Sequence, residues 1–403
     1  MKTKLIFLLG IVFLINACKN DNPEPHVFKR GQITDSEKSG TRTTTDIKAL
    51  LSLYSYSFAS QINYTYGVDL YSIKYETINP DGSETIASGL LAVPIGKTTV
   101  SPLLSFQHGT VLKDNIVPST LALGSGMEIG LIFGTEGYVV CMPDYLGLGA
   151  GEGLHPYMHA KSEATASIDM IRAAKNKLSE LGISINNQLF LLGYSQGGHA
   201  TMATHQAIEQ DYADEFTVTA SAPMAGPFDV SGIMADIVLR KEAYKSPGYL
   251  PYMLYAYNSV YHFYDNLEAN FKAPYNTSLP LYFNGENLYT LSDVNDVMPS
   301  IPSDILTDAA YNEIFNHTNQ KIWDALKDND LYDWVPVAPI RMFHCDGDVT
   351  VPIENSQKAL DHFIANGVNN ADLVNPLQGG THSTCLFPSL LGAKNWFNEF
   401  AQK

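Results

Sequence analysis

An apolar run at residues 189–192 leads directly into Gly193-Tyr194-Ser195-Gln196-Gly197, and a segment with helical character follows. The pattern Gly-x-Ser-x-Gly is common by chance, but a strand before it and a helix after it give it meaning. Glycines two positions before and after the serine let strand and helix approach closely around a strained turn. Such a turn lifts Ser195 clear of the sheet, beside the positive end of the next helix. Ser195 is therefore the candidate nucleophile.

Helix-like segments separate a series of apolar segments that we predict to be strands: 102–107, 137–142, 188–192, 216–225, 340–345 and 371–376. This alternation favours an α/β fold, with a mostly parallel sheet and helices on both of its faces. Residues 68–77 and 84–93 flank Asn79-Pro80-Asp81-Gly82, which is a turn signal and predicts an antiparallel hairpin near the start.

The alternation stops at residues 229–335, which are rich in aromatic side chains. Ten tyrosines lie between Tyr244 and Tyr289. We predict that this segment is an inserted helical cap, and that residues 46–228 and 336–403 form the catalytic domain. Most of the aromatic side chains are expected to form the core of the cap, and some to line a pocket. Where a cap lies over such a sheet, a ligand cleft is expected at the boundary between the cap and the sheet.

The first residues are typical of an export signal. Lys2 and Lys4 form a basic start, and the apolar stretch at residues 5–15 is too short to span a bilayer. The small residue Ala17 stands directly before Cys18. This ending resembles the bacterial lipoprotein signal, in which the cysteine is lipidated and becomes the first mature residue.

We therefore predict a lipoprotein signal peptide at residues 1–17, lipidation of Cys18 and anchoring of the exported protein in the cell envelope, at the outer membrane. An ordinary secretory signal is the alternative. Residues 18–45 are polar and contain no long apolar run, so they are predicted to form a flexible tether.

A serine nucleophile needs a histidine to accept its proton and a carboxylate to orient that histidine. In sheet hydrolases the acid and then the histidine follow the serine along the chain. The strand at 340–345 ends in Asp346-Gly347-Asp348, and a carboxylate in such a turn lies beside the serine turn. Residues 344–352 resemble the acid loop of many α/β-hydrolases, in which the carboxylate aligns with Asp348. This resemblance favours Asp348 as the acid, with Asp346 as the alternative.

The candidate base is His382, in the small-residue loop Gly379-Gly380-Thr381-His382 ahead of a C-terminal helix. One histidine among 11 is weak evidence alone, but its order and loop context favour it. For the oxyanion, one donor is the backbone N–H of Gln196, after the nucleophile. The second is expected after an earlier strand, at Thr110, with Gly109 as the alternative.

Three cysteines follow Cys18. Cys141 lies in an apolar strand segment and is expected to be a packed thiol. Cys345 and Cys385 lie near the two loops that carry the candidate acid and base. In an exported protein these two could form a disulfide, or each could be a separate buried thiol.

The formal net charge of −17 excludes some classes of partner. Such a surface repels phosphate backbones, so nucleic-acid binding is not expected. The two histidines His155 and His159 have no convincing third ligand, and no phosphate-binding loop or dinucleotide fingerprint follows a strand. We therefore predict no metal and no cofactor. A neutral or apolar small molecule is the expected substrate, and the lipid anchor is the only expected membrane contact.

Several segments together resemble the α/β-hydrolase superfamily, and within it the secretory lipase family typified by yeast lipase A. They are Phe106-Gln107-His108-Gly109-Thr110, residues 143–149, His155-Pro156-Tyr157 and residues 193–198. The resemblance covers about residues 65–403 and is weakest across the insertion. It implies a capped serine esterase or lipase with Ser195, Asp348 and His382 as nucleophile, acid and base.

The expected function is cofactor-free hydrolysis of carboxylic esters through an acyl-enzyme. The same triad also serves an esterase acting on acylated polysaccharide or a serine peptidase, and both remain alternatives. A surface lipoprotein that binds a ligand without catalysis is the alternative from another class of protein.

Overall fold

The computed structural model describes residues 27–403. The predicted signal peptide at 1–17 and the lipidation site Cys18 lie outside this range. The strands are β1 (Ile33–Arg42), β2 (Val68–Ile78), β3 (Glu84–Pro94), β4 (Ser101–Gln107), β5 (Val139–Pro143), β6 (Ile185–Tyr194), β7 (Val218–Met224), β8 (Ile340–Phe343) and β9 (Ala371–Val374). The helices of the sheet region are α1 (Thr44–Tyr54), α2 (Tyr56–Ala59), α3 (Met127–Thr135), α4 (Ala160–Glu180), α5 (Gln196–Asp211), α12 (Glu354–Ala365) and α13 (His382–Phe400).

The strands form one sheet in the order β1-β2-β3-β5-β4-β6-β7-β8-β9. β1, β2, β3 and β5 are joined by antiparallel pairings, while every pairing from β5 to β9 is parallel. The predicted hairpin is β2–β3, and the predicted parallel strands are all present. Because β6, β7 and β8 run parallel, the loops after β6 and β8 lie at the same, carboxyl end of the sheet.

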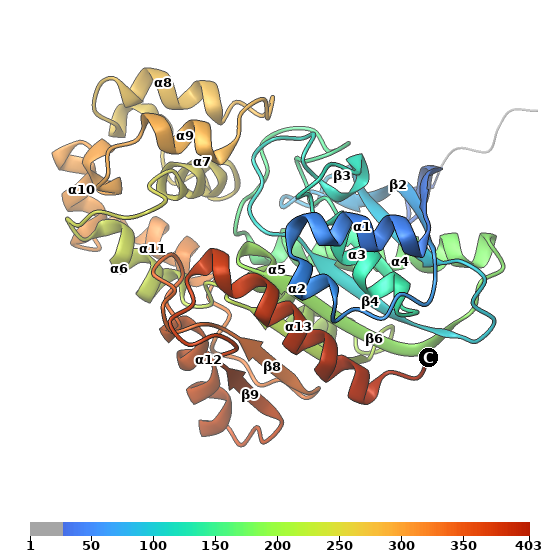
Figure 1. The fold of residues 1–403 in the computed structure, drawn as a ribbon. Helices are drawn as coiled ribbons and strands as arrows, with labels where there is room; N and C mark the ends of the chain where they lie inside the picture. The colour runs from blue at the N-terminus through green and yellow to red at the C-terminus, as the bar shows by residue number, and fades with distance from the viewer. Residues whose placement is uncertain (1–26) are drawn as a thin grey trace, which may run out of the picture.

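Helices cover both faces of this sheet, as the alternation predicted (Figure 1). On one face, side chains of α1, α3 and α13 share a core with the inner strands, for example Leu51, Ile132 and Phe397. On the other face, α4 packs on the strands through residues such as Ile171, and α5 and α12 continue the layer. A sheet buried on both sides explains why its parallel strands read as continuous apolar runs.

The predicted flexible tether is wrong over residues 33–42, which form strand β1. β1 pairs with β2 from Ile33 opposite Tyr75 to Arg42 opposite Val68. It is an edge strand, so backbone hydrogen bonds to β2 hold it and its side chains need not be apolar. Just before it, the Arg30 guanidinium lies 2.9 Å from the buried carboxylate of Asp169 on α4, which fixes the entry of the chain.

The segment between β7 and β8 contains only helices among its regular elements: α6 (Ala235–Leu239), α7 (Tyr249–Tyr261), α8 (Tyr275–Tyr282), α9 (Leu291–Val297), α10 (Asp308–Phe315) and α11 (Gln320–Lys327). Figure 1 shows α7 to α10 to one side of the sheet. Aromatic side chains such as Tyr252, Tyr257 and Phe271 are buried in a core that these helices share. Within the described part of the chain, no helix is long and apolar enough to cross a bilayer.

Candidate active site

Ser195 occupies the sharp turn between β6 and α5. Its φ is 61°, a left-handed conformation that a serine rarely adopts. The flanking glycines allow this turn because a Cβ on Gly193 would lie 2.1 Å from the carbonyl oxygen of Gly197. A Cβ on Gly197 would lie 2.0 Å from the carbonyl oxygen of Gln107 on β4. The sequence pattern therefore corresponds to backbone contacts that only glycine permits.

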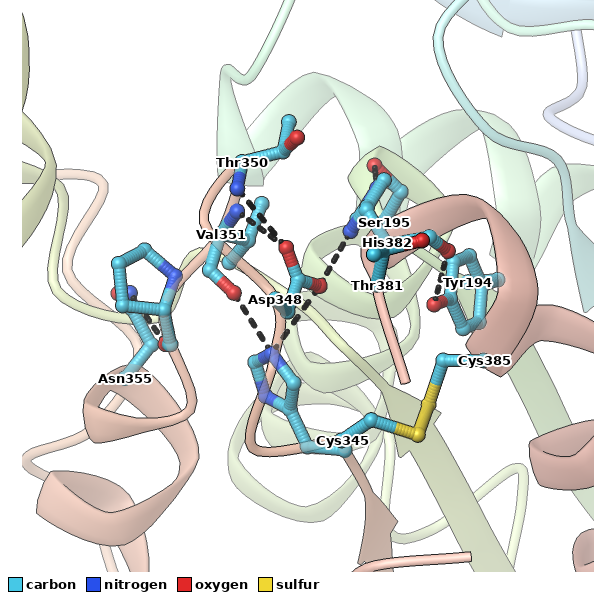
Figure 2. Close-up of polar contacts among 12 residues, drawn as sticks. Tyr194, Ser195, Cys345, Asp348, Thr350, Val351, Asn355, Thr381, His382 and Cys385 are labelled. Carbon is cyan, nitrogen blue, oxygen red and sulfur yellow. Dashed lines mark hydrogen bonds and ion pairs between the residues drawn. A yellow bond between two sulfur atoms is a disulfide. The ribbon is translucent and has the colours of Figure 1, made fainter. Parts of the chain in front are cut away.

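His382 is the first residue of α13, directly after the N-cap Thr381. Its Nε2 lies 2.8 Å from Ser195 Oγ, and its Nδ1 lies 2.5 Å from Asp348 Oδ2. Figure 2 shows the imidazole between the other two side chains. The Tyr194 hydroxyl donates to the His382 carbonyl at 2.7 Å and ties α13 to the serine turn. Three predicted residues thus meet although they are far apart in the sequence.

Asp348 is buried in the loop after β8, where its Oδ1 accepts hydrogen bonds from the amides of Thr350 and Val351, both at 2.9 Å. Asp346, the alternative acid, is exposed and accepts a hydrogen bond from the Gly379 amide at 2.6 Å. Of the two aspartates, only Asp348 contacts His382. The Asp346 carboxylate instead holds the loop that leads to the histidine.

A second imidazole, which the sequence analysis did not identify, lies against Asp348. His344 Nε2 lies 2.7 Å from the carbonyl oxygen of Val351 and 3.4 Å from Asp348 Oδ2. Because a carbonyl can only accept, Nε2 carries a proton. Burial disfavours the charge of Asp348, but the hydrogen bonds from His344 and His382 outweigh it and hold the pKa of Asp348 below its ordinary value.

A disulfide joins Cys345 to Cys385, the first of the two arrangements considered from the sequence. It connects the end of β8 to the first turn of α13 (Figure 2). These are the elements that carry Asp348 and His382, so the covalent link limits their separation. Cys141 is a buried free thiol, as expected.

The candidate oxyanion donors come from two different loops. Gln196 is the first residue of α5, and the first amides of a helix have no partner within the helix. Gly109 and Thr110 border the same cavity as Ser195. The Thr110 hydroxyl lies 3.2 Å from the Tyr157 hydroxyl. The oxyanion role of the Gln196 and Thr110 amides stays a prediction.

A buried polar network, also not predicted, supports Gln196, the residue after Ser195. The Gln196 side-chain amide donates to Glu163 Oε1 at 2.9 Å and lies 2.7 Å from His155 Nε2. The other oxygen of Glu163 lies 2.7 Å from His199 Nδ1. His199 Nε2 lies 3.0 Å from the carbonyl oxygen of Asn329, close to α11. Residues from α4, α5 and the segment after α11 therefore fix the start of α5. Within residues 27–403, no group of three or more His, Cys, Asp or Glu could hold a metal ion.

Two pockets meet at Ser195. The first, here called the α7 pocket, is bordered by Ser195, Gln196 and side chains from the helical segment such as Met234, Tyr249 and Met253. The second, here called the α1–α3 pocket, is bordered by Ser195 and by residues of α1, α3 and α13.

The family model of the secretory lipases matches residues 119–401. The chain belongs to the secretory lipase family. The matched stretch contains Ser195, Asp348 and His382, whereas Thr110 precedes it. The secreted triacylglycerol lipase LIP5 of Malassezia furfur is 24% identical over 254 aligned residues, and the match covers 59% of this chain and 60% of that relative. The chain thus aligns with less than two thirds of that relative's length.

Solved structures share the fold of this secretory lipase family member. A Legionella pneumophila protein described as a hydrolase is 28% identical, with a TM-score of 0.83 over 91% of this chain and 98% of its own. The rice cell wall degrading esterase LipA of Xanthomonas oryzae is 27% identical, with a TM-score of 0.81 over 92% and 99%. Candida antarctica lipase A is 20% identical over 93% and 84%, with a TM-score of 0.68, and shows likeness of fold alone. The predicted α/β-hydrolase fold is confirmed.

Proposed function

We propose that this member of the secretory lipase family is a serine hydrolase of carboxylic esters, with Ser195 as nucleophile, His382 as base and Asp348 as the orienting acid. The observation that carries the proposal is the continuous hydrogen-bonded chain from Asp348 through both nitrogens of His382 to Ser195. Family membership supports it, because relatives in this family are named lipases.

In the proposed reaction, Ser195 Oγ attacks the ester carbonyl carbon while His382 Nε2 takes the hydroxyl proton. Asp348 keeps the Nδ1–H tautomer in place and stabilises the imidazolium that forms. The amides of Gln196 and Thr110 would stabilise the negative charge on the former carbonyl oxygen. His382 then gives the proton to the leaving alcohol. A water molecule, deprotonated by His382, attacks the acyl-enzyme and releases the acid and Ser195.

The chain is proposed to be exported and held in the cell envelope by a lipid on Cys18. The basic start, the short apolar stretch and the small residue before Cys18 support this, and one relative is named a secreted lipase. Incorporation of a labelled fatty acid that disappears in Cys18→Ser would support the anchor. Unchanged labelling in that variant would contradict it.

A second candidate is an esterase that acts on acylated polysaccharide. The structural likeness to LipA, named a rice cell wall degrading esterase, favours this candidate. Ser195-dependent release of acetate from acetylated xylan, without turnover of esters of longer acids, would distinguish it.

The test of the proposed function is turnover of p-nitrophenyl esters by the purified protein beside Ser195→Ala. We expect at least about a 10⁴-fold loss of kcat, because the variant lacks the hydroxyl that lies against Nε2 of His382. A fluorophosphonate should add covalently to the native protein and not to the variant.

The exposed Ser383, next to His382, offers a matched control. Ser383→Ala should keep both turnover and labelling. Full turnover by folded Ser195→Ala would overturn the assignment of the nucleophile.

A further inference from the structure

Three buried titratable side chains next to the serine turn have no part in the reaction proposed above. They are Glu163 on α4, His199 on α5 and His155 in the loop before α4. Burial of such groups is unfavourable unless their polar atoms find partners. Glu163 and His155 both contact the side chain of Gln196, and His199 contacts Glu163. The three groups therefore gather around the residue that follows Ser195.

The side-chain amide of Gln196 is oriented by two acceptors. Its nitrogen lies 2.9 Å from Glu163 Oε1 and 2.7 Å from His155 Nε2. His155 Nδ1 lies 2.8 Å from the carbonyl oxygen of Leu146, which can only accept, so Nδ1 carries the proton and Nε2 is an acceptor. Burial lowers the pKa of His155 to about 3, which keeps this ring neutral. Both hydrogens of the Gln196 amide are therefore donated to buried groups.

Glu163 is held in turn from its other oxygen. Its Oε2 lies 2.7 Å from His199 Nδ1, and His199 Nε2 lies 3.0 Å from the carbonyl oxygen of Asn329. Because that carbonyl can only accept, Nε2 carries one proton, and a second proton lies between Nδ1 and Oε2. The side chain of Asn329 is also fixed, since it accepts a hydrogen bond from the Ala160 amide at 2.7 Å. The Glu163 carboxyl group cannot turn away from Gln196 without breaking the short contact with His199.

The peptide group between Ser195 and Gln196 is fixed at both of its ends. At one end, the Ser195 carbonyl oxygen accepts hydrogen bonds from the amides of Gly198 and His199, at 2.8 and 3.2 Å. At the other end, the Gln196 side chain is held by its two acceptors. Because a peptide group is planar, these contacts together set the direction of the Gln196 backbone N–H. A donor that points at the developing oxyanion before the reaction begins is the most effective kind.

We propose that Glu163 is a positioning residue, which acts through the side chain of Gln196 to aim the backbone N–H that stabilises the oxyanion. It acts by geometry and not by charge, because the proton between Glu163 and His199 leaves this pair without net charge. The inference rests on the proposed function and adds a residue of α4 on which the rate depends.

The first test is Gln196→Met, which keeps the backbone N–H and the length of the side chain but removes the amide that Glu163 holds. We expect kcat on a p-nitrophenyl ester to fall by about 10- to 100-fold, as for a displaced reacting group. KM should change by less than about threefold, because the donor acts mainly in the transition state. The matched control is Gln206→Met at a half-buried position of the same helix, and its kcat should stay close to the native value.

A trifluoromethyl ketone measures the oxyanion contact directly, because Ser195 adds to its carbonyl and the oxygen becomes an alkoxide. Its Ki should rise in Gln196→Met by about the factor by which kcat falls, as expected for a mimic of the transition state. A merely structural role of the side chain would act differently. It would lower the number of active sites, which titration with a fluorophosphonate counts, and leave Ki unchanged.

Glu163→Leu and Glu163→Gln separate geometry from charge. Glu163→Leu removes the acceptor and should reproduce the changes in kcat and Ki of Gln196→Met. Glu163→Gln keeps an oxygen for Gln196, and its nitrogen can donate to a neutral His199, so this variant should recover most of the loss. In the double variant with leucine at 163 and methionine at 196, the two losses should not multiply, because both act through one N–H.

Native kcat and Ki in folded Gln196→Met would overturn the proposal, as would equal losses in the two Glu163 variants or losses that multiply in the double variant. Circular dichroism establishes that each variant is folded, and the Ki of Gln196→Met supplies the result if Glu163→Leu does not fold. Failure of the proposed function would look different, because the native protein itself would then show no Ser195-dependent turnover.

Discussion

Two aspartates stand two positions apart in the loop after β8, and their surroundings give them different roles. Asp348 is buried, accepts two backbone hydrogen bonds on one oxygen and contacts His382 with the other. Asp346 is exposed and accepts one hydrogen bond from the Gly379 amide. The order of residues could predict an acid in this loop. The choice between the two depends on which carboxylate turns inward. The resemblance to the α/β-hydrolases favoured Asp348, which is the one that contacts the histidine.

Asp348→Asn should lower kcat by about 10⁴-fold, because an amide does not hold the tautomer of His382 that leaves Nε2 free to accept the serine proton. The measurement is kcat and KM on a p-nitrophenyl ester, and KM should change much less than kcat. Asp346→Asn is the matched control and should keep most of the activity, since its side chain is exposed. Equal losses of kcat in both variants would mean that the conformation of the loop, and not the charge of Asp348, determines the rate.

At the scale of elements, the turn between β6 and α5 depends on how closely three backbone segments approach. Gly193 faces Gly197 across the turn, and Gly197 faces the carbonyl of Gln107 at the end of β4. The obstacles to a side chain are backbone atoms, which cannot rotate away as a side chain can. The strained φ of Ser195 persists because the strand, the helix and β4 hold it from three sides.

Gly197→Ala should therefore displace Ser195 and cost at least about 1–3 kcal/mol of unfolding free energy, in the range of overpacked cores. A displacement of about 1 Å is enough to lower kcat by about 100-fold. Urea unfolding and ester turnover measure the two effects. In the control Gly40→Ala, the nearest atom to the new Cβ is 3.4 Å away, at the end of the Arg42 side chain, so both quantities should hardly change. Native activity in Gly197→Ala would show that the turn is less restrictive than its contacts indicate.

A helix or strand could be predicted from the sequence where its own side chains form a recognisable pattern of apolar residues and turn signals. The β2–β3 hairpin has apolar strands around a turn signal at Asn79-Pro80-Asp81-Gly82, and both strands were expected. β1 was missed because its sequence, Ile33 to Arg42, is mostly polar and its pairing is set by the backbone of β2. An edge strand is held by backbone hydrogen bonds to a single adjacent strand. One sequence does not reveal which segment will pair with that strand.

At the scale of the whole molecule, the unpredicted parts of the site are those that join distant segments. Glu163 of α4 meets Gln196 and His199 of α5, and His199 reaches Asn329 after α11. The Asn329 side chain in turn accepts from the Ala160 amide at 2.7 Å. These residues follow no local sequence pattern, because the hydrogen-bond partner of a buried polar group can come from a distant part of the chain. The proposed catalytic residues could be predicted because the ends of strands and the order along the chain restrict where they can lie.

Burial of histidine side chains also makes the free energy of unfolding of the whole fold depend on pH. Burial lowers the pKa of His155 to about 3, outweighing the hydrogen bond to the Leu146 carbonyl, and it lowers the pKa of His159 to about 4. An unfolded histidine titrates near 6.5. Between pH 4 and 6.5 the unfolded chain therefore binds more protons than the folded one, and stability must rise with pH in this window.

We expect the unfolding free energy to fall as the pH drops from 7 to 5, by up to about 1.4 kcal/mol per pH unit for each buried histidine. Urea unfolding at closely spaced pH values measures this slope. Asp114, whose pKa burial raises to about 6, contributes with the opposite sign, so the slope is the excess of the histidine contributions over that of Asp114. His159→Gln removes one group that must stay uncharged in the fold, so its slope should be shallower than that of the native protein. The exposed control Lys245→Gln should leave the slope unchanged. A native stability that does not vary from pH 5 to 7 would mean that these imidazoles accept protons without unfolding the chain.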